Sequence, residues 1–290
     1  MIDRRSLAFA LAAAAATPFP SRAVAQENRL SAAFARIEAQ SGGRLGVAVI
    51  DTATGATAGH RADERFPMCS TFKALAAAAI LRRVDAGEEQ LGRRVRYEAK
   101  DLVTYSPVTE KHTADGMTLA EICEAAVTLS DNTAGNLMLA ALGGPAGLTA
   151  FARSLGDPVT QLDRIETALN EAKPGDPQDT TTPAAMAANL RALVLEGTLS
   201  AASREQLTAW LVANKTGDAR LRAGLPPGWR VGDKTGTGAN GTNNDVGVLW
   251  PPRGAPIVIA VYLTGTPMKM EQTNPLIAAV ARAVSETIRN

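Results

Sequence analysis

The β-rich runs near the two ends of the chain constrain the fold most, because helical patterns fill almost everything between them. Near the N-terminus, residues 45–50 and 56–60 read as a hairpin joined by a turn-rich connection. Three more runs, residues 229–237, 245–250 and 256–264, follow near the C-terminus. Strands from both ends can share one sheet if the middle of the chain forms an insertion. We therefore expect an α/β plus all-α fold: an antiparallel sheet flanked by helices, built from both chain ends, with an inserted all-helical domain.

Turn and capping residues divide the helical part of the sequence. A first helix ends at Gly42, and residues 66–213 are expected to be almost wholly helical. This pattern predicts an α/β domain made of residues 26–62 and 213–290, and a helical domain of residues 63–212. The start signals are capping boxes at Thr118 with Glu121 and at Ser203 with Gln206, Thr182-Pro183, and Asn274-Pro275 before the last amphipathic helix.

Residues 1–25 have the pattern of an export signal. A basic start with Arg4 and Arg5 precedes a short apolar run over residues 7–16, and small residues at 23–25 fit a cleavage site. The apolar run is too short and too rich in alanine to span a bilayer, so we expect no membrane association after cleavage. The arginine pair leaves both the Sec and the twin-arginine route open. We expect a periplasmic or secreted monomer.

The charge balance and the histidines exclude several classes of function. The 30 Lys and Arg against 29 Asp and Glu give no basic excess for binding a nucleic acid. The two histidines, His60 and His112, lie far apart in sequence and in no recognisable motif, which argues against a Ser-His-Asp triad. No cluster of Cys and His has the spacing of a zinc site. We therefore expect neither a metal nor another cofactor.

Ser70 is the candidate nucleophile. It lies where a long apolar run, residues 74–81, begins, and Lys73 follows three residues later on the same face of the expected helix. A serine hydroxyl needs a base to take its proton, and Lys73 can serve as one. The helix N-terminus adds N–H groups that favour an oxyanion next to Ser70. A serine and a lysine at this spacing also occur by chance, so the pair alone identifies no enzyme.

Three further motifs follow this pair in order. They are Ser130-Asp131-Asn132, the segment 164–170 with Glu166 inside it, and Lys234-Thr235-Gly236-Thr237. The combination resembles a class A serine β-lactamase, over the whole mature chain. The resemblance implies hydrolysis of the β-lactam amide bond of antibiotics through a serine acyl-enzyme, with a β-lactam as the small-molecule substrate.

The catalytic roles can be argued from residue chemistry beside the resemblance. Ser130 can relay a proton to the β-lactam nitrogen, because Lys73 and Lys234 would favour loss of its own proton. Glu166 can accept a proton from the water that removes the acyl group, and the Asn170 amide can hold that water. The expected catalytic residues are Ser70, Lys73, Ser130 and Glu166.

The resemblance also gives structural roles to residues around Glu166. Arg164 and Asp179 are expected to pair and close the loop, and Asn136 to tie the loop to the helical domain. Lys173–Asp179, rich in Pro, Gly and Asp, is expected to be a compact surface loop.

Substrate recognition is expected beside the last motif. Lys234, Thr235 and Thr237 would lie on a strand and bind the substrate carboxylate, while the N–H groups of Ser70 and Thr237 form the oxyanion hole. Asn132 offers a donor and an acceptor to a substrate amide, and Tyr105 an apolar wall at the cleft mouth.

Many relatives carry an arginine shortly after the Lys-Thr-Gly motif, but this chain has none between Lys234 and Arg253. Arg220 matches the position from which other family members deliver that guanidinium, and Arg222 is the alternative. Thr237 stands where penicillin-preferring relatives often have alanine. We therefore expect a broad or extended spectrum of penicillins and cephalosporins.

Two other functions remain to be weighed. A penicillin-binding DD-peptidase or a β-lactam sensor shares the serine, lysine and Lys-Thr-Gly pattern but forms a long-lived adduct, and Glu166 with Asn170 argues against both. A binding module could use the same fold without chemistry.

The resemblance further implies that Cys69 and Cys123 are free, buried thiols. The positions of their usual disulfide partners hold Gly238 and Ala77.

Overall fold

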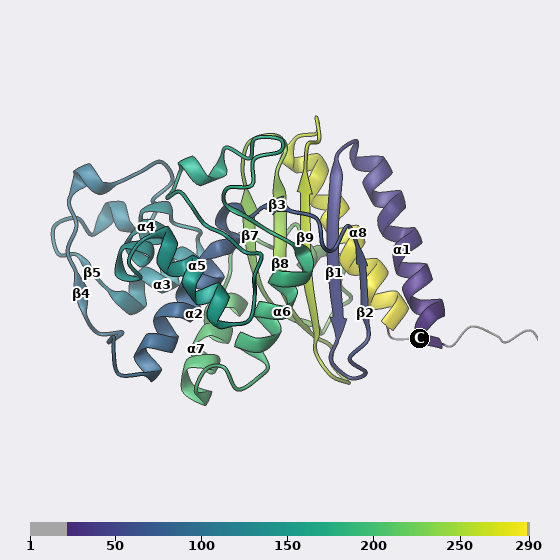
Figure 1. Cartoon of the computed structure of the whole chain (residues 1–290), viewed down its shortest axis with the longest axis horizontal. Coiled ribbons are helices and arrows are strands. Elements are labelled where there is room, and N and C mark those ends of the chain that lie inside the picture. The colour runs from purple at the N-terminus through teal and green to yellow at the C-terminus, as the bar shows by residue number, and fades with distance from the viewer. Residues whose placement is uncertain (1–21, 289–290) are drawn as a thin grey trace, which may run out of the picture.

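A computed structural model describes residues 22–288, with side chains from Gln26 onward, and Figure 1 shows a helical part beside a sheet. The sheet in this range has five antiparallel strands in the order β2-β1-β9-β8-β7. The first two strands come from the N-terminal part of the chain and the other three from the C-terminal part, which confirms the expected fold class. Their bounds are β1 Arg44–Asp51, β2 Thr57–His60, β7 Arg230–Thr237, β8 Asn243–Trp250 and β9 Ile257–Thr264.

Both faces of the sheet are covered. Successive side chains of a strand point to opposite sides, so neighbouring residues of β1 enter different cores. Val47 and Val49 of β1 pack with helices α1, Arg22–Ser41, and α8, Met270–Ile288. Ala48 belongs instead to the core that the sheet shares with the helical part. The buried strands therefore read as nearly continuous apolar runs rather than as an alternation of polar and apolar residues.

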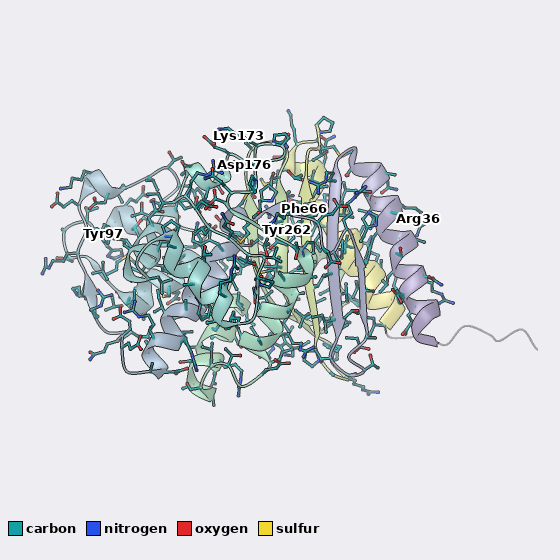
Figure 2. The ribbon with its side chains drawn as sticks, in the orientation of Figure 1. Arg36, Phe66, Tyr97, Lys173, Asp176 and Tyr262 are labelled. Atoms are coloured by element: carbon teal, nitrogen blue, oxygen red, sulfur yellow. The ribbon has the colours of Figure 1, made fainter. Side chains whose placement is uncertain are left out.

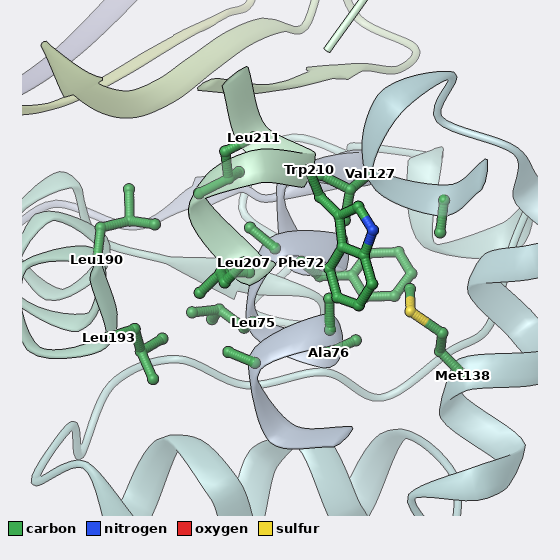
Figure 3. Packing of buried hydrophobic residues seen from close by; sticks show 14 of the residues in the cluster. Phe72, Leu75, Ala76, Val127, Met138, Leu190, Leu193, Leu207, Trp210 and Leu211 are labelled. Atoms are coloured by element: carbon green, nitrogen blue, oxygen red, sulfur yellow. The ribbon is translucent and has the colours of Figure 1, made fainter. Parts of the chain in front are cut away.

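Helix α2, Phe72–Asp85, runs through the middle of the helical part, and its residues from Phe72 to Leu81 are all buried. A helix that is apolar on every side requires other helices around it. Figure 3 shows Phe72 and Leu75 packed against side chains that include Trp210 and Leu207. Replacing a buried Phe such as Phe72 by Ala typically costs about 3–5 kcal/mol.

The surrounding helices are α3 Leu119–Thr128, α4 Asn132–Ala141, α5 Pro145–Ser154, α6 Pro183–Val194 and α7 Ala201–Val212. Two short two-stranded pairings complete this part, β3 Phe66–Pro67 with β6 Thr180–Thr181, and β4 Arg94–Val95 with β5 Met117–Thr118.

Two of the four predicted helix starts are wrong, while the start at Thr182-Pro183 is confirmed, because Thr182 caps α6. The capping box of Thr118 with Glu121 is present, but Ser200 caps α7, so Ser203 lies inside the helix and donates its backbone N–H to the Ser200 hydroxyl at 3.2 Å. Helix α8 begins at Met270, before Asn274, because the Gln272 side chain accepts the Lys269 backbone N–H at 3.1 Å. Lysine is no usual cap residue, so this start gave no sequence signal.

The predicted export signal lies outside the described residues, apart from its last four positions, which belong to α1. From residue 22 to residue 288, none of the helices is both long and apolar enough to cross a bilayer. The two predicted domain boundaries stay predictions.

Candidate active site

A cleft of about 400 Å³ lies between the helical part and strand β7. The two walls come from segments far apart in the sequence. Ser70, Tyr105, Ser130, Asn132 and Asn170 line it from the helical side, and Thr216, Arg220, Thr235, Thr237 and Met270 from the strand side. Most of the predicted site residues therefore meet in one place.

Ser70 lies in a single 3₁₀ turn, Cys69–Thr71, that leads directly into α2. The turn is anchored because the Thr71 hydroxyl donates to the Met68 carbonyl at 2.8 Å. Asn244 of β8 donates to the same carbonyl at 3.1 Å. Side-chain hydrogen bonds to the Met68 carbonyl thus anchor the turn, and the one from Asn244 ties it to the sheet. Ser70, 7% exposed, faces the cleft.

Ser70, Lys73 and Glu166 form a buried triangle of side chains. Lys73 Nζ lies 3.0 Å from Ser70 Oγ and 2.9 Å from Glu166 Oε1, and Ser70 Oγ donates to Glu166 Oε1 at 3.1 Å. Lys73 also contacts the Ser130 carbonyl at 2.9 Å and Asn132 Oδ1 at 2.7 Å. Burial lowers the pKa of Lys73, although the Glu166 carboxylate opposes that shift. A group that can lose and regain a proton therefore lies beside the nucleophile.

Glu166 is held by two asparagines. Asn136 Nδ2 donates to the Glu166 carbonyl at 3.0 Å, and Asn136 Oδ1 accepts the Glu166 N–H at 2.8 Å. Asn170 Nδ2 donates to Glu166 Oε2. Asn170 Oδ1 is buried and accepts no hydrogen bond from residues 22–288. Such an acceptor beside a carboxylate is a place for an ordered water.

The segment that carries Glu166 is closed by Arg164 and Asp179. Arg164 Nε donates to Asp179 Oδ2, and the Arg164 N–H to Asp179 Oδ1 at 2.9 Å. Arg164 also pairs with Asp176 at 3.2 Å. In Figure 2 Asp176 and Lys173 lie at the outer edge of this loop, far from Arg36 on α1. The ion pairs tie the two ends of the loop together.

Ser130 and Asn132 flank the buried Asp131. The Asp131 carboxylate caps α4 by accepting the Ala134 N–H at 2.8 Å, and it also accepts the Thr109 N–H at 3.0 Å. These bonds hold Ser130 at the cleft, where Lys234 Nζ donates to Ser130 Oγ at 3.0 Å. Burial and the repulsion of Lys73 lower the pKa of Lys234 well below its usual value.

Arg220 lies behind β7 and is only 4% exposed. Its guanidinium donates to the carbonyls of Gly236 at 3.1 Å and Asn244 at 2.6 Å, and to Thr237 Oγ1 at 2.8 Å. Arg220 therefore lines the cleft beside the Thr237 hydroxyl, to which it donates.

Comparison with known proteins gives the family. The family model described as the beta-lactamase enzyme family matches residues 29–288. Beta-lactamase FAR-1 of Nocardia farcinica is 55% identical over 259 residues, which cover 89% of this chain and 83% of that protein. Beta-lactamase AST-1 of Nocardia asteroides is 55% identical over 255 residues, or 88% and 82% of the two chains.

Solved structures agree. An ancestral class A β-lactamase, named for the last common ancestor of Gram-negative bacteria, superposes with a TM-score of 0.88 at 67% identity, covering 89% of this chain and 99% of that one. The chain belongs to the class A β-lactamases. It is a serine hydrolase that acts on β-lactams.

Arg222, the alternative to Arg220, points away from the cleft of this β-lactamase. Its Nη2 lies 2.6 Å from Asp233 Oδ1, and it also donates to the Leu211 carbonyl at 3.2 Å. Tyr105 is 56% exposed at the cleft, as expected for a wall at its mouth. The Asn132 side-chain oxygen accepts a hydrogen bond from Lys73, and one N–H of its amide donates to the Thr104 carbonyl at 2.8 Å. The second N–H of that amide has no acceptor within residues 22–288.

The two cysteines are free and buried, as expected. Burial raises the pKa of both thiols. A Cβ added at Gly238 would lie 2.6 Å from Cys69 Sγ, which shows how closely the two segments approach. Both cysteines act as small apolar side chains in the β-lactamase core.

Sequence reasoning missed three residues of the strand wall: Thr216, which lines the cleft, and Asn214 and Asp233, which do not. Asn214 Nδ2 donates to Asp233 Oδ2 at 2.9 Å, and Thr216 Oγ1 lies 2.5 Å from Thr235 Oγ1. The available signal was Asp233 itself, a charged residue in an expected buried strand, because such a charge requires partners.

Proposed function

We propose that this β-lactamase uses Ser70 as nucleophile, Lys73 as the base for acylation, Ser130 as the proton relay and Glu166 as the base for deacylation. The observation that carries the proposal is the triangle of Ser70, Lys73 and Glu166 beside the cleft, with all three contacts between 2.9 and 3.1 Å. Lys73 lies within hydrogen-bond reach of the Ser70 proton, and the Glu166 carboxylate lies beside the Ser70 oxygen, to which the acyl group would be attached when water attacks it.

In acylation, Ser70 Oγ attacks the β-lactam carbonyl and its proton passes to Lys73. The carbonyl oxygen then becomes an oxyanion, which the backbone N–H groups of Ser70 and Thr237 would stabilise. Removal of one such donor typically costs about 10²–10³ in kcat. The position of Ser70 in the turn that leads into α2 supports this role, because the first N–H groups of a helix have no intrahelical partner.

The leaving β-lactam nitrogen needs a proton once the amide bond breaks. Ser130 supplies it and is recharged from Lys73. The position of Ser130 between two lysines supports the role: Lys234 Nζ contacts its hydroxyl and Lys73 Nζ its carbonyl. Two nearby ammonium groups stabilise the ionised Ser130 hydroxyl that remains after Ser130 has given its proton to the nitrogen.

In deacylation, Glu166 takes a proton from a water that attacks the acyl carbonyl. The unsatisfied Asn170 oxygen beside the Glu166 carboxylate supports a water position there. Asn136, Arg164 and Asp179 serve to hold the loop that carries Glu166.

The substrate carboxylate binds to the strand wall, where Thr235, Thr237 and Arg220 line the cleft and the buried Lys234 contacts it through the Ser130 hydroxyl. The pairing of Arg222 with Asp233 supports the choice of Arg220. Asn132 would bind the substrate side-chain amide and Tyr105 would pack on its apolar part. We further propose a broad or extended spectrum, which includes penicillins and cephalosporins, and export as a monomer by residues 1–25.

Steady-state hydrolysis by the purified mature chain tests the proposal. We expect turnover of benzylpenicillin and of an oxyimino-cephalosporin, and loss of both with Ser70→Ala, which removes only the nucleophilic oxygen. A parent protein that stops after one equivalent of substrate would instead indicate a DD-peptidase or a sensor. Turnover of benzylpenicillin alone would contradict the proposed spectrum.

A further inference from the structure

The hydroxyls of Thr235 and Thr237 both face the cleft, but their partners differ. Thr237 Oγ1 accepts a hydrogen bond from Arg220 Nη2 at 2.8 Å. Thr235 Oγ1 lies 2.5 Å from Thr216 Oγ1. Each hydroxyl has one hydrogen to donate, and a substrate carboxylate can only accept. The direction of these bonds therefore decides which threonine can bind a carboxylate.

The direction of the Thr216 bond follows from Asn214. Asn214 Nδ2 donates to Asp233 Oδ2 at 2.9 Å, and Asn214 Oδ1 accepts the Thr216 N–H at 3.0 Å, so the two ends of the amide are fixed. The Thr216 hydroxyl lies 2.8 Å from that same Oδ1. An amide oxygen has no hydrogen to give, so Thr216 donates to it.

Thr216 has then used its hydrogen, and its oxygen can only accept from Thr235. The Thr235 hydrogen consequently points at Thr216, away from a ligand. Thr237 is in the opposite state, because its oxygen accepts from Arg220 while no residue from 22 to 288 accepts its own hydrogen. The Thr237 hydrogen is free to point into the cleft.

This ordering requires that Asp233 is an acceptor. Arg222 Nε donates to Asp233 Oδ1 at 2.7 Å, which favours the ionised carboxylate. The neighbouring Asp245 is fully buried, and burial together with the Asp233 charge raises the pKa of Asp245 well above its usual value. The contact with Arg222 therefore keeps the Asp233 carboxylate an acceptor, which fixes the Asn214 amide.

We propose that Thr216 is a positioning residue that holds the Thr235 hydroxyl proton away from the substrate, so that Thr216 weakens carboxylate binding at Thr235 and leaves Thr237 as the donating hydroxyl. The inference rests on the proposed function of the strand wall as the carboxylate site.

Thr216→Val tests the inference, because valine keeps the shape of threonine and removes the acceptor. The Thr235 proton becomes available to the substrate carboxylate, so KM for benzylpenicillin should fall at least about tenfold, the value of one hydrogen bond to a charged group, with kcat little changed. Thr216→Ser keeps the acceptor oxygen, so its KM should equal that of the parent protein. In the double variant Thr216→Val with Thr235→Val the gain should vanish, because no hydroxyl proton remains to be released.

An unchanged or higher KM in Thr216→Val, or a gain that persists without the Thr235 hydroxyl, would overturn the inference. If Thr216→Val does not fold, as judged by thermal unfolding, two single variants decide: Thr237→Val should raise KM more than Thr235→Val, and the reverse order would overturn the inference. Parent protein that fails to turn over benzylpenicillin would instead contradict the proposed function itself, which keeps the two failures distinct.

Discussion

The two walls of the cleft hold their positive charges in different ways. On the helical wall, Lys73 has a carboxylate partner, because Glu166 Oε1 lies 2.9 Å from its ammonium group. On the strand wall, Lys234 hydrogen-bonds to the Ser130 hydroxyl and the Thr235 carbonyl, and Arg220 to carbonyl, hydroxyl and amide oxygens. All of these partners on the strand wall are neutral.

The difference separates chemistry from recognition. A balanced acid–base pair can move a proton with little change in net charge, which suits bond making and breaking. Two buried cations with neutral partners are costly until an anion binds, since burial disfavours the charged form. Substrate binding would recover part of that cost, so the strand wall selects for a carboxylate. The predictions below test this division.

Glu166→Ala should have the largest effect. Loss of a general base typically costs about 10²–10⁴ in rate, here in deacylation, while Ser70 still has Lys73 at 3.0 Å. Mass spectrometry after mixing with benzylpenicillin should show the acyl adduct accumulating. Because the Ser70 hydroxyl donates to Glu166 in the free enzyme, slow adduct formation would instead make Glu166 the base for acylation.

Arg222→Ala should destabilise the protein without impairing carboxylate binding, although Arg222 is close to the strand wall. It leaves the buried Asp233 charge without its cation, which we expect to cost about 3 kcal/mol of unfolding free energy. Urea unfolding measures the cost. The double variant Arg222→Ala with Asp233→Asn removes the unpaired charge and should recover part of the lost unfolding free energy. If KM rises more in Arg222→Ala than in Arg220→Ala, Arg220 is not the arginine that binds the substrate carboxylate.

Arg220→Ala should raise KM for carboxylate-bearing substrates at least about tenfold, the value of one charge-assisted hydrogen bond. The mutation removes both the charge behind β7 and the donor that orients the Thr237 hydroxyl. Steady-state kinetics on benzylpenicillin checks it. Arg220→Lys keeps the charge but loses the several directed bonds, so its KM should fall between parent and alanine.

Glu38→Gln, remote from both walls, should change stability alone. Burial would raise the pKa of Glu38, but hydrogen bonds from Arg61 and from the Leu45 N–H lower it from 4.5 to about 2. A folded-state pKa below the unfolded one adds stability above pH 4.5 that is lost as pH falls toward 2. We expect a loss of about 1 kcal/mol at neutral pH after allowance for solvent screening, and convergence of the two proteins near pH 2. Thermal unfolding of both proteins as a function of pH measures this difference in stability. A change in kcat or KM for benzylpenicillin would contradict the prediction.

The sequence predicts the fold class because each signal is local. Glycines at the helix ends, two β-rich groups and the apolar run after Ser70 each depend on residues close in the chain. The start of α8 could not be predicted, because the bond from Lys269 to Gln272 uses a residue type with no preference for caps.

The site divides in the same way. Ser70 and Lys73 are three residues apart across the 3₁₀ turn and the start of α2, so their contact follows from helical spacing. The partners of Arg220 could not be read from the sequence, because Gly236 and Asn244 contribute carbonyl oxygens, which every residue type carries. The direction of the Thr216 hydrogen bond depends on Asn214 and Asp233 together, and no single motif contains all three residues.

Single-turnover acylation in the Glu166→Ala background tests the division of the cleft most directly, because the adduct then reports binding and chemistry without deacylation. The rate of adduct formation is followed against benzylpenicillin concentration, with and without Arg220→Ala. If the strand wall recognises and the helical wall reacts, Arg220→Ala raises the half-saturating concentration about tenfold or more and leaves the limiting rate within about twofold. A fall in the limiting rate at an unchanged half-saturating concentration would contradict the account.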